Sequence, residues 1–401
     1  MLEQILSAAN FELAYLKIVE QFALDRKNWQ YHGLDNLLLT DYDLSSGELI
    51  ATAQLELRQK KAIEPALALK IPKKSNPAKF REIFIYNLKE RVKAQAIYQA
   101  VLPVFESRFS DRLFSYRPGK PPYLAAKNFG RRYRSHFKSD QALILDLENY
   151  SDLIDKDILF AQLQGIFTEV EVLELLRLFI YNQVYREGII SQPTKGLVQG
   201  VPLIALFANL YLTDLDFKYQ SQVPFYIRVG DDIALLDQRS DKLARIKAEF
   251  ISDLEAKKLT VNTRKLFLGS AQDQFSFLGY SFNNGLISLE PSFVRKLELG
   301  WKQILVHKHL SESQKDRLFR KKLAEPKNNY NFQFAKIIKD KPQVNDSGQL
   351  EKVSESFFRI LTRFFYITYS SRHRRLLVDR LNQFGLKSLY SYYKKFHYER
   401  D

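Results

Sequence analysis

The chain of 401 residues carries 61 Lys and Arg against 46 Asp and Glu, so its net charge is +15. A hydrophobic fraction of 45% is ordinary for a globular protein and excludes a disordered or collagen-like chain. The absence of cysteine excludes disulfides, cysteine-based zinc sites and a thiol nucleophile. The basic excess favours nucleic acid as a partner, although a solvated basic surface or an anionic membrane would account for the same charge.

The N-terminal segment argues against export. It contains Glu3 and lacks the uninterrupted apolar core of a signal peptide. No apolar run elsewhere approaches the ~18 residues of a membrane span. We therefore expect a soluble, cytoplasmic protein with no membrane partner.

In chain order, residues 1–61 have apolar positions at helical spacing and predict a helical extension. Two apolar runs flank a Lys-, Ser-, Asn- and Pro-rich turn in 62–86, which predicts a β-hairpin with a basic tip. Residues 88–108 have a helical pattern, and SYRPGK (115–120) predicts a loop because Pro and Gly interrupt regular structure.

ALILDLENY (142–150) predicts a buried strand that ends in carboxylates, and a helical stretch follows over 155–185. GLVQGVP (196–202) predicts a loop that opens another helix. FYIRVGDDIALL (225–236) has two apolar arms around Gly-Asp-Asp, which is typical of a hairpin.

The last part of the chain predicts an amphipathic helix over 243–254 and short strands near Val261 and over 275–282. Helices follow from about residue 290, interrupted by a polar segment at 327–349. Hairpins and strands alternating irregularly with helices predict an α+β fold with an antiparallel catalytic sheet, not a doubly wound parallel one.

Three aspartates lie where rigid elements end: Asp146 at the end of the buried strand, and Asp231 and Asp232 in the hairpin. Nucleotide transfer needs such an arrangement, because two Mg²⁺ ions about 3.5–4 Å apart hold the attacking and leaving oxygens in line. Mg²⁺ prefers oxygen ligands, and a few carboxylates with substrate phosphates suffice. A lone Asp-Asp pair is common in solvated loops, so the neighbouring motifs decide between the two interpretations.

Those neighbours resemble the motifs of prokaryotic reverse transcriptases, in family order and with family-like gaps over about residues 62–285. The matching segments are KKSNPAKFREI (73–83), FSYRPGK (114–120), LDLENYSDLID (145–155), GLVQGVPLIALFANLYLTDLD (196–216), RVGDDIALL (228–236), LEAKKLTVNTRKLFLG (254–269) and FSFLGYSF (275–282). The resemblance implies a right-hand polymerase with fingers at 62–140, a palm at 141–285 and a helical thumb at 286–401.

The resemblance also implies roles for individual residues. The metal ligands would be Asp146, the backbone of Leu147, Asp231 and Asp232, with two Mg²⁺ ions or Mn²⁺ in their place. Lys74 and Arg81 would hold the incoming triphosphate, since Arg forks onto phosphate oxygens and Lys supplies a point charge; a solvated basic hairpin is the alternative. The other implied nucleotide-site residues are Tyr150, Ser151, Gln199, Gly200 and Lys265, of which Gly200 would equally serve as a turn glycine and Lys265 as a surface lysine.

Basic residues outside these motifs are candidates for nucleic-acid contacts. Arg117 would contact template or primer, or else support its loop. Arg131 and Arg132 belong to a basic patch in FGRRYRSHFK (129–138). Arg372, Arg374 and Arg375 lie among aromatic residues, most of which have the helical spacing of a packed core.

Several positions depart from the family pattern. The hairpin residue that is normally Tyr or Phe is Val229, the Pro before Gln199 is Val198, and a Ser-Pro pair is replaced by Ile204-Ala205. The position five after Asp146, usually aromatic, is Ser151, with Tyr150 just before it. These changes point to divergent bacterial branches such as abortive-infection and defence-associated reverse transcriptases.

The sequence therefore predicts RNA-templated DNA synthesis, in anti-phage defence or in a small retroelement. The partners would be an RNA template, a DNA product and nucleoside triphosphates, and the template would be a dedicated non-coding RNA or another RNA. An RNA-templated RNA polymerase and a non-catalytic RNA-binding protein of the same fold are the alternatives. The oligomeric state stays open.

Overall fold

The structure, a computed structural model, describes residues 1–24, 32–38, 47–73, 76–324 and 334–398. The chain forms two compact units. The first comprises Met1–Pro122 and Leu143–Leu268, and the second comprises Tyr123–Ala142 and Gly269–Asp401.

Helices form the N-terminal part of the first unit. They are α1 (Leu2–Ile5), α2 (Ala8–Leu24), α3 (Gly47–Arg58) and α4 (Leu88–Arg108). Each of the first three packs against α4, whose buried Phe105 contacts the rings of Phe109, Phe167 and Phe207. The described residues of 1–61 contain three helices, and the predicted helix over 88–108 is confirmed.

A four-stranded sheet in the first unit has the order β2-β1-β4-β5. Its strands are β1 (Ala66–Lys73), β2 (Asn76–Ile85), β4 (Val184–Arg186) and β5 (Ile189–Ser191). β1 and β2 form the predicted antiparallel hairpin, and β1 runs parallel to β4. Ion pairs tie the two hairpins together, Lys70 with Glu187 at 2.9 Å and Arg186 with Glu82 at 2.9 Å.

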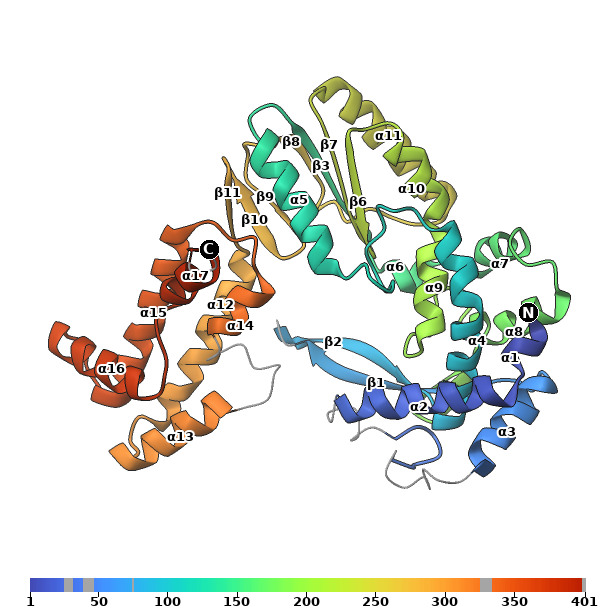
Figure 1. Cartoon of the computed structure of the whole chain (residues 1–401), viewed down its shortest axis with the longest axis horizontal. Helices are drawn as coiled ribbons and strands as arrows, with labels where there is room; N and C mark the ends of the chain where they lie inside the picture. The colour runs from blue at the N-terminus through green and yellow to red at the C-terminus, as the bar shows by residue number, and fades with distance from the viewer. Residues whose placement is uncertain (25–31, 39–46, 74–75, 325–333, 399–401) are drawn as a thin grey trace. The chain divides into compact units, whose positions relative to one another are not determined.

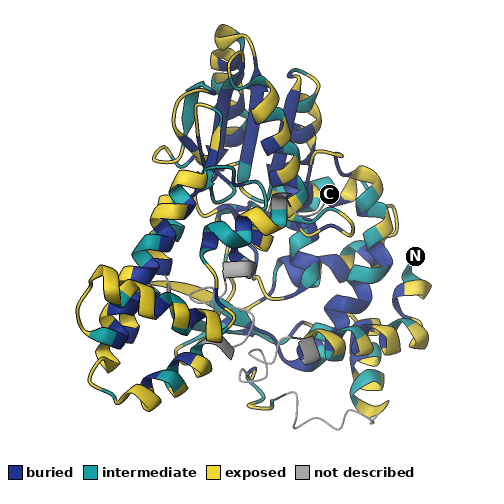
Figure 2. Ribbon diagram, turned by 60° about the vertical axis from the view of Figure 1, so that its left-hand side comes forward, coloured by how far each residue is buried: buried dark blue, intermediate teal, exposed yellow. Residues whose placement is uncertain are grey.

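A second four-stranded sheet, of order β6-β7-β3-β8, carries the predicted catalytic aspartates. Its strands are β3 (Gln141–Asp146), β6 (Phe225–Val229), β7 (Asp232–Asp237) and β8 (Phe267–Ser270). β6 and β7 form the predicted antiparallel hairpin, and β3 is buried from Ala142 onward, as its apolar sequence requires (Figure 2). The prediction of a strand near Val261 is wrong, since Val261 makes only an isolated β-bridge to Leu147.

The described part of the first unit contains six more helices. They are α6 (Tyr150–Leu153), α7 (Lys156–Gln164), α8 (Val170–Ile180), α9 (Pro202–Tyr211), α10 (Thr213–Gln220) and α11 (Ser240–Ala256). The stretch predicted as helical over 155–185 is two helices followed by the start of β4. α10 contacts β6 and α11 contacts β7 (Figure 1). The buried face of α11, with Leu243, Ile246, Phe250 and Leu254, is the predicted amphipathic one.

The second unit combines a small sheet with helices. Its elements are α5 (Pro122–His136), β9 (Phe275–Phe277), β10 (Tyr280–Asn283), β11 (Leu286–Leu289), α12 (Pro291–Lys302), the 3₁₀ helix η3 (Gln303–His307), α13 (Glu312–Ala324), α14 (Phe334–Asp340), α15 (Ser347–Tyr366), α16 (Ser371–Gln383) and α17 (Leu389–Tyr398). Phe129 of α5 packs against the rings of Phe275, Phe277 and Phe282. α14 lies in the segment predicted to interrupt the helices.

The described elements confirm an α+β fold with antiparallel hairpins, and the pairing of β1 with β4 is parallel. Within the described ranges, no helix is both long enough and apolar enough to cross a membrane.

Candidate active site

The site begins with the two-residue turn of the β6–β7 hairpin. Val229 pairs with Asp232, so Gly230 and Asp231 form the turn. Gly230 has φ +63°, which favours glycine, and a Cβ there would meet no atom within 4 Å. The turn therefore requires glycine for its backbone conformation and not for close packing.

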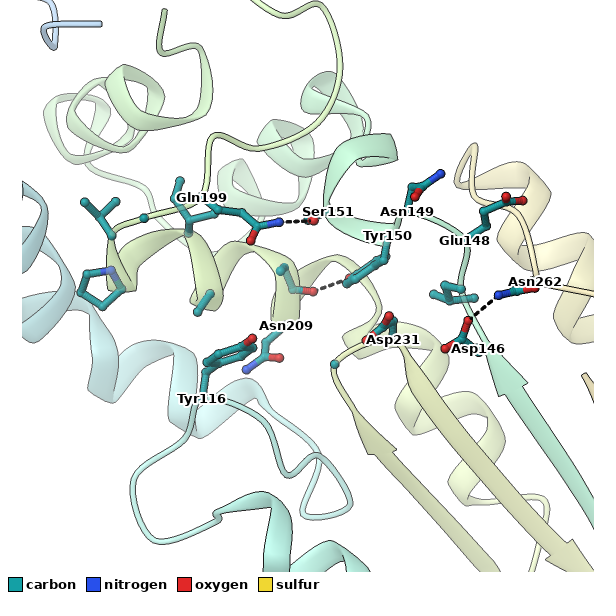
Figure 3. Close-up of a pocket in the computed structure, with 18 of the residues that line it drawn as sticks. Tyr116, Asp146, Glu148, Asn149, Tyr150, Ser151, Gln199, Asn209, Asp231 and Asn262 are labelled. Carbon is teal, nitrogen blue, oxygen red and sulfur yellow. Dashed lines mark hydrogen bonds between the residues drawn. The ribbon is translucent and has the colours of Figure 1, made fainter. Parts of the chain in front are cut away.

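The end of β3 lies beside this turn. β3 and β7 are neighbours in the sheet, and the backbone N–H of Leu147 donates to the carbonyl of Asp231 at 3.2 Å. Asp232 begins β7 and lies close enough to Asp146 for their carboxylates to interact. The structure thus brings together the three carboxylates that the sequence singled out, and Figure 3 shows two of them, Asp146 and Asp231.

Mutual repulsion marks this group of carboxylates. Burial and the charges of Asp231 and Asp146 raise the pKa of Asp232 to about 7. Burial and the charge of Asp146 also raise the pKa of Asp231 above its usual value. Neighbouring carboxylates resist being charged together, so a positive charge at this place would relieve the repulsion.

Asp146 already has two partners from the segment that follows α11. Asn262 donates its Nδ2 to Oδ1 of Asp146 at 3.0 Å, and Lys265 donates its Nζ to Oδ2 at 2.6 Å. The backbone N–H of Asn262 also donates to the carbonyl of Asp146 at 2.8 Å. Although burial opposes it, this ion pair raises the pKa of Lys265. The ammonium of Lys265 thus supplies a positive charge beside the carboxylates.

The donor set suits a hard divalent cation, because it consists of carboxylate oxygens, and the pKa values of Asp231 and Asp232 are raised. Over the described ranges, however, no three His, Cys, Asp or Glu side chains form a ready metal cluster. Both oxygens of Asp146 face Asn262 and Lys265. Lys265 would therefore have to release Asp146 before Asp146 and Asp231 bound one cation.

A cavity of about 820 Å³ opens beside the carboxylates. The predicted site residues among those lining it are Asp146, Leu147, Tyr150, Ser151, Gln199, Gly200, Asp231 and Lys265. Asp232, the first residue of β7, is half-buried and is not one of the lining residues. The volume is within the range of small-molecule and cofactor sites.

Ser151 and Gln199 meet across this cavity (Figure 3). Gln199 donates its Nε2 to Oγ of Ser151, and the backbone N–H of Leu197 donates to the carbonyl of Ser151 at 2.9 Å. Two motifs that lie 48 residues apart in sequence therefore form one wall.

Tyr150 borders the same cavity and is buried. β3 ends at Asp146, Asn149 has a left-handed backbone with φ 47°, and α6 begins at Tyr150. The hydroxyl of Tyr150 donates to the carbonyl of Ala208. A regular strand, in which Tyr150 and Ser151 would face opposite ways, therefore does not reach these residues, and both reach the cavity.

Gly200 has φ +122°, and a Cβ would lie 2.6 Å from the carbonyl oxygen of Phe84 in β2. Glycine is thus required where the loop before α9 crosses β2, in addition to its position at the cavity.

Two predicted contacts, Arg81 and Arg117, do not line the cavity. Lys74 is outside the described residues. Arg81 is exposed on β2 and does not line the cavity. Arg117 is 8% exposed and donates to Glu106 and to the carbonyls of Ser110 and Leu113, the last two at 2.6 and 3.1 Å. These bonds engage Arg117 in support of its loop, the alternative that the sequence had left open.

The remaining arginines belong to the second unit. Arg131 and Arg132 are on α5, and Arg372, Arg374 and Arg375 are on α16. Arg132 pairs with the buried Asp140 at 2.8 Å, and Arg374 pairs with Glu355 at 2.8 Å. Arg131, Arg372, Arg374 and Arg375 are exposed, whereas Arg132 is partly buried.

The cavity also has lining residues that were not predicted as site residues. They include Tyr116, Glu148, Asn149, Asn209 and Asn262. Asn209 and Asn262 lie in the motifs, but the motifs assigned them no contact. Tyr116 gave no signal beyond its place in the loop before α5.

A buried polar network lies beneath the turn. Arg228 and Asp216 are both fully buried and pair at 2.6 Å. Arg228 also donates to the carbonyls of Asn209 at 2.9 Å and Gly230 at 3.3 Å. The N–H of Gly230 donates to Oγ of Ser115 at 2.9 Å, and that hydroxyl donates to Asn209 at 2.9 Å. Both backbone groups of Gly230 are therefore held from below.

Comparison with known proteins identifies a family. The family model "Reverse transcriptase (RNA-dependent DNA polymerase)" matches residues 71–282, which include every lining residue of the cavity. No curated protein sequence is significantly similar to the chain.

Among solved structures, similarity is found to apo telomerase from Candida tropicalis truncated from its C-terminal domain. The identity is 17%, the match covers 61% of this chain and 60% of that chain, and the TM-score is 0.43. Apo telomerase from Candida tropicalis has 16% identity, 84% and 66% coverage and a TM-score of 0.44. Telomerase from Candida albicans in complex with the TWJ fragment of telomeric RNA has 14% identity, 81% and 67% coverage and a TM-score of 0.45. The chain thus spans about two thirds or less of the length of these proteins.

Proposed function

The chain belongs to the reverse transcriptase (RNA-dependent DNA polymerase) family, and from this membership we propose that it copies an RNA template into DNA at Asp146, Asp231 and Asp232. Its α+β architecture is that of a right-hand polymerase. The observation that carries the proposal is the convergence of three carboxylates at neighbouring strand ends, beside a cavity of about 820 Å³.

Enzymes with such a domain use divalent metal ions, and we propose two Mg²⁺ ions, or Mn²⁺, as the cofactor. The residues that would hold them are Asp146, Asp231, Asp232 and the carbonyl of Leu147. When bound, the ions would activate the attacking 3′-hydroxyl and stabilise the leaving pyrophosphate. The hard oxygen donors and the raised pKa of Asp232 support this assignment.

The chain's own side chains have separate tasks in this proposal. Lys265 moves its charge from Asp146 to the phosphates of the nucleotide, aided by Lys74 and Arg81 from the β1–β2 hairpin. Ser151, Gln199 and Tyr150 border the sugar. The support is that Lys265, Ser151, Gln199 and Tyr150 all line the cavity that contains Asp146 and Asp231.

Nucleic acid would be held by all three parts of a polymerase hand. We assign residues 62–140 to the fingers, 141–285 to the palm and 286–401 to the thumb. The exposed Arg131, Arg372 and Arg375 would contact the backbone of the RNA template and the DNA product, and the charge of +15 supports a polyanionic partner. The template would be a dedicated non-coding RNA or another RNA.

We further propose that the protein belongs to a divergent bacterial branch that acts against phage. The departures at Val198, Ser151, Ile204-Ala205 and Val229 motivate this assignment. Cells that express the wild type should plate phage less efficiently than cells that express Asp231→Asn. Equal plating over a broad phage panel would remove the support for a defence role.

A second candidate product is RNA. The observation in its favour is the small Ser151, which lines the cavity and leaves room for a 2′-hydroxyl. Extension with ribonucleotides alone, at a rate that exceeds extension with deoxyribonucleotides, would establish this alternative.

Primer extension on an RNA template, with each nucleotide set in turn, tests the proposal. The wild type should extend with deoxyribonucleotides in the presence of Mg²⁺. Asp146→Asn and Asp231→Asn should abolish extension while they leave RNA binding and the melting temperature nearly unchanged.

Asp241→Asn is the matched control, because Asp241 is an exposed carboxylate in α11 outside the cavity. This variant should extend like the wild type. Wild-type extension by the double variant Asp231→Asn/Asp232→Asn would refute the assigned site. Binding of RNA without extension by the wild type would favour a non-catalytic RNA-binding protein.

A further inference from the structure

Tyr116 stands out among the residues that line the cavity. It is 69% exposed, it lies beside Asn209 (Figure 3), and it lines the same cavity as Gly230 and Asp231. Its backbone has φ 54°, in the left-handed region. A bulky aromatic residue rarely adopts this conformation, because its Cβ crowds the backbone.

The neighbours of Tyr116 impose this conformation. Ser115 is 3% exposed, its Oγ bonds to Asn209 and Gly230, and its carbonyl accepts from Nδ2 of Asn209 at 2.7 Å. On the other side, Arg117 is anchored by Glu106 and by two backbone carbonyls. The loop is therefore fixed on both sides of an exposed ring.

Contacts between the Tyr116 ring and the rest of the protein do little to offset this backbone strain. Among the described residues it has no aromatic or cation–π contact, and its hydroxyl has no hydrogen-bond partner. Backbone strain that internal packing does not offset is typical of residues that act on a ligand. The hairpin itself offers no ring here, because Val229 precedes Gly230.

We propose that Tyr116 is a nucleic-acid-binding residue of this site, and that its ring packs against the nucleobase at the growing 3′ end of the product strand. The assignment rests on the proposed polymerase function. Aromatic rings bind bases by stacking without regard to sequence.

The position of Tyr116 fits the base at the growing end of the product strand. In the proposed function the sugar and phosphates of the incoming nucleotide lie near Ser151, Asp146 and Lys265. In-line transfer brings the attacking 3′-oxygen from the side opposite the leaving pyrophosphate. The part of the cavity lined by Tyr116, Gly230 and Asp231 is left for the strand that carries that oxygen.

Tyr116→Asn is the informative variant, because it removes the ring while asparagine tolerates a left-handed backbone. Its affinity for an RNA–DNA primer–template with a recessed DNA 3′ end, measured by fluorescence anisotropy, should fall about 5- to 150-fold. The nucleotide KM should change less than twofold, and the melting temperature should stay the same or rise. Tyr116→Phe should keep wild-type affinity, since stacking needs the ring and not the hydroxyl.

Tyr123→Asn is the matched control, because Tyr123 is 58% exposed and does not line the cavity; its affinity should equal that of the wild type. Unchanged affinity in Tyr116→Asn would overturn the proposal, as would a rise in the nucleotide KM alone. A fall in the melting temperature together with the affinity would overturn it in favour of a structural ring. In each case Asp231-dependent extension by the wild type would leave the polymerase function standing, whereas its absence would refute that function separately.

Discussion

The β6–β7 hairpin has two faces, and charged side chains repel one another on one face and are paired on the other. On the cavity face, Asp146, Asp231 and Asp232 repel one another, and the pKa of Asp232 rises to about 7 through burial and this repulsion. On the reverse face, Arg228 and Asp216 are fully buried, but each is paired and hydrogen-bonded. Beneath the turn the two charges neutralise each other, whereas above it three carboxylates have one counter-charge, that of Lys265 on Asp146.

The difference separates support from function. A buried ion pair costs desolvation free energy and is tolerated only with good geometry and further hydrogen bonds, which Arg228 finds at the carbonyls of Asn209 and Gly230. Carboxylates that repel one another are unfavourable until a cation arrives. The satisfied network holds the turn in a conformation that the carboxylates alone would not favour.

The largest expected effect comes from breaking the reverse face. Asp216→Asn leaves the buried guanidinium of Arg228 without a counter-charge and should lower the free energy of unfolding by about 3–5 kcal/mol. Urea denaturation followed by circular dichroism measures this change. Glu187→Gln is the control, since it breaks the Lys70–Glu187 pair, in which both side chains are largely exposed; it should produce no measurable change. Equal effects of the two variants would contradict the comparison.

The next effect concerns sugar choice on the cavity face. Tyr150 and Ser151 both line the cavity, so either could exclude a 2′-hydroxyl by its bulk. We expect weaker discrimination against ribonucleotides than an aromatic at the Ser151 position would give, and Ser151→Phe should improve it about 10-fold or more, since an overfilled site costs about 1–3 kcal/mol.

Incorporation ratios of deoxyribonucleotide to ribonucleotide, measured for wild type, Ser151→Phe and Tyr150→Ala, test this expectation. If Tyr150→Ala alone collapses the selectivity and Ser151→Phe leaves it unchanged, Tyr150 is the gate. The hydroxyl of Tyr150 is fixed on the carbonyl of Ala208, so Tyr150→Phe separates the loss of that bond from the loss of the ring.

On the cavity face, removing a carboxylate should have a smaller effect on the free energy of unfolding, and in the opposite direction to Asp216→Asn. Asp232→Asn removes one of three repelling carboxylates, so the free energy of unfolding in metal-free buffer should stay the same or rise by about 0.5–1 kcal/mol, the usual gain when a strained functional site is relieved. Thermal unfolding with chelator measures it. A loss of stability as large as that of Asp216→Asn would show that the two faces do not differ.

The sequence could predict what depends on local patterns. An apolar run that ends at Asp146, and apolar arms around Gly230-Asp231, indicated a strand end and a hairpin, and the structure has both. The motifs also brought Ser151 and Gln199 into one expected site, and a hydrogen bond now joins them. That they bind a nucleotide remains a prediction.

What depends on distant contacts could not be predicted. Ser115 and Asn209 lie 94 residues apart in sequence, so nothing local indicates that they fix Tyr116 at the cavity. Arg117 and Arg131 are both arginines in basic segments, yet one is buried on Glu106 and the other is exposed. Tyr150 and Ser151 would face opposite ways only in a strand, and the strand ends at Asp146, before the left-handed Asn149.

The smallest expected effect extends the comparison to two adjacent arginines of α5. Arg131 is exposed, whereas Arg132 pairs with Asp140, which is only 1% exposed. If Arg131 contacts one phosphate, Arg131→Gln should reduce the slope of log affinity against log salt by about 0.7–0.9, which is about threefold in affinity over a fourfold change in salt. It should not change the stability. Arg132→Gln should instead leave the slope nearly unchanged and lower the melting temperature, because Asp140 loses its partner. Anisotropy titrations at four salt concentrations, with thermal unfolding of the same samples, separate the two outcomes. If Arg132→Gln flattens the slope and Arg131→Gln does not, then pairing within the chain does not decide which charges serve nucleic acid.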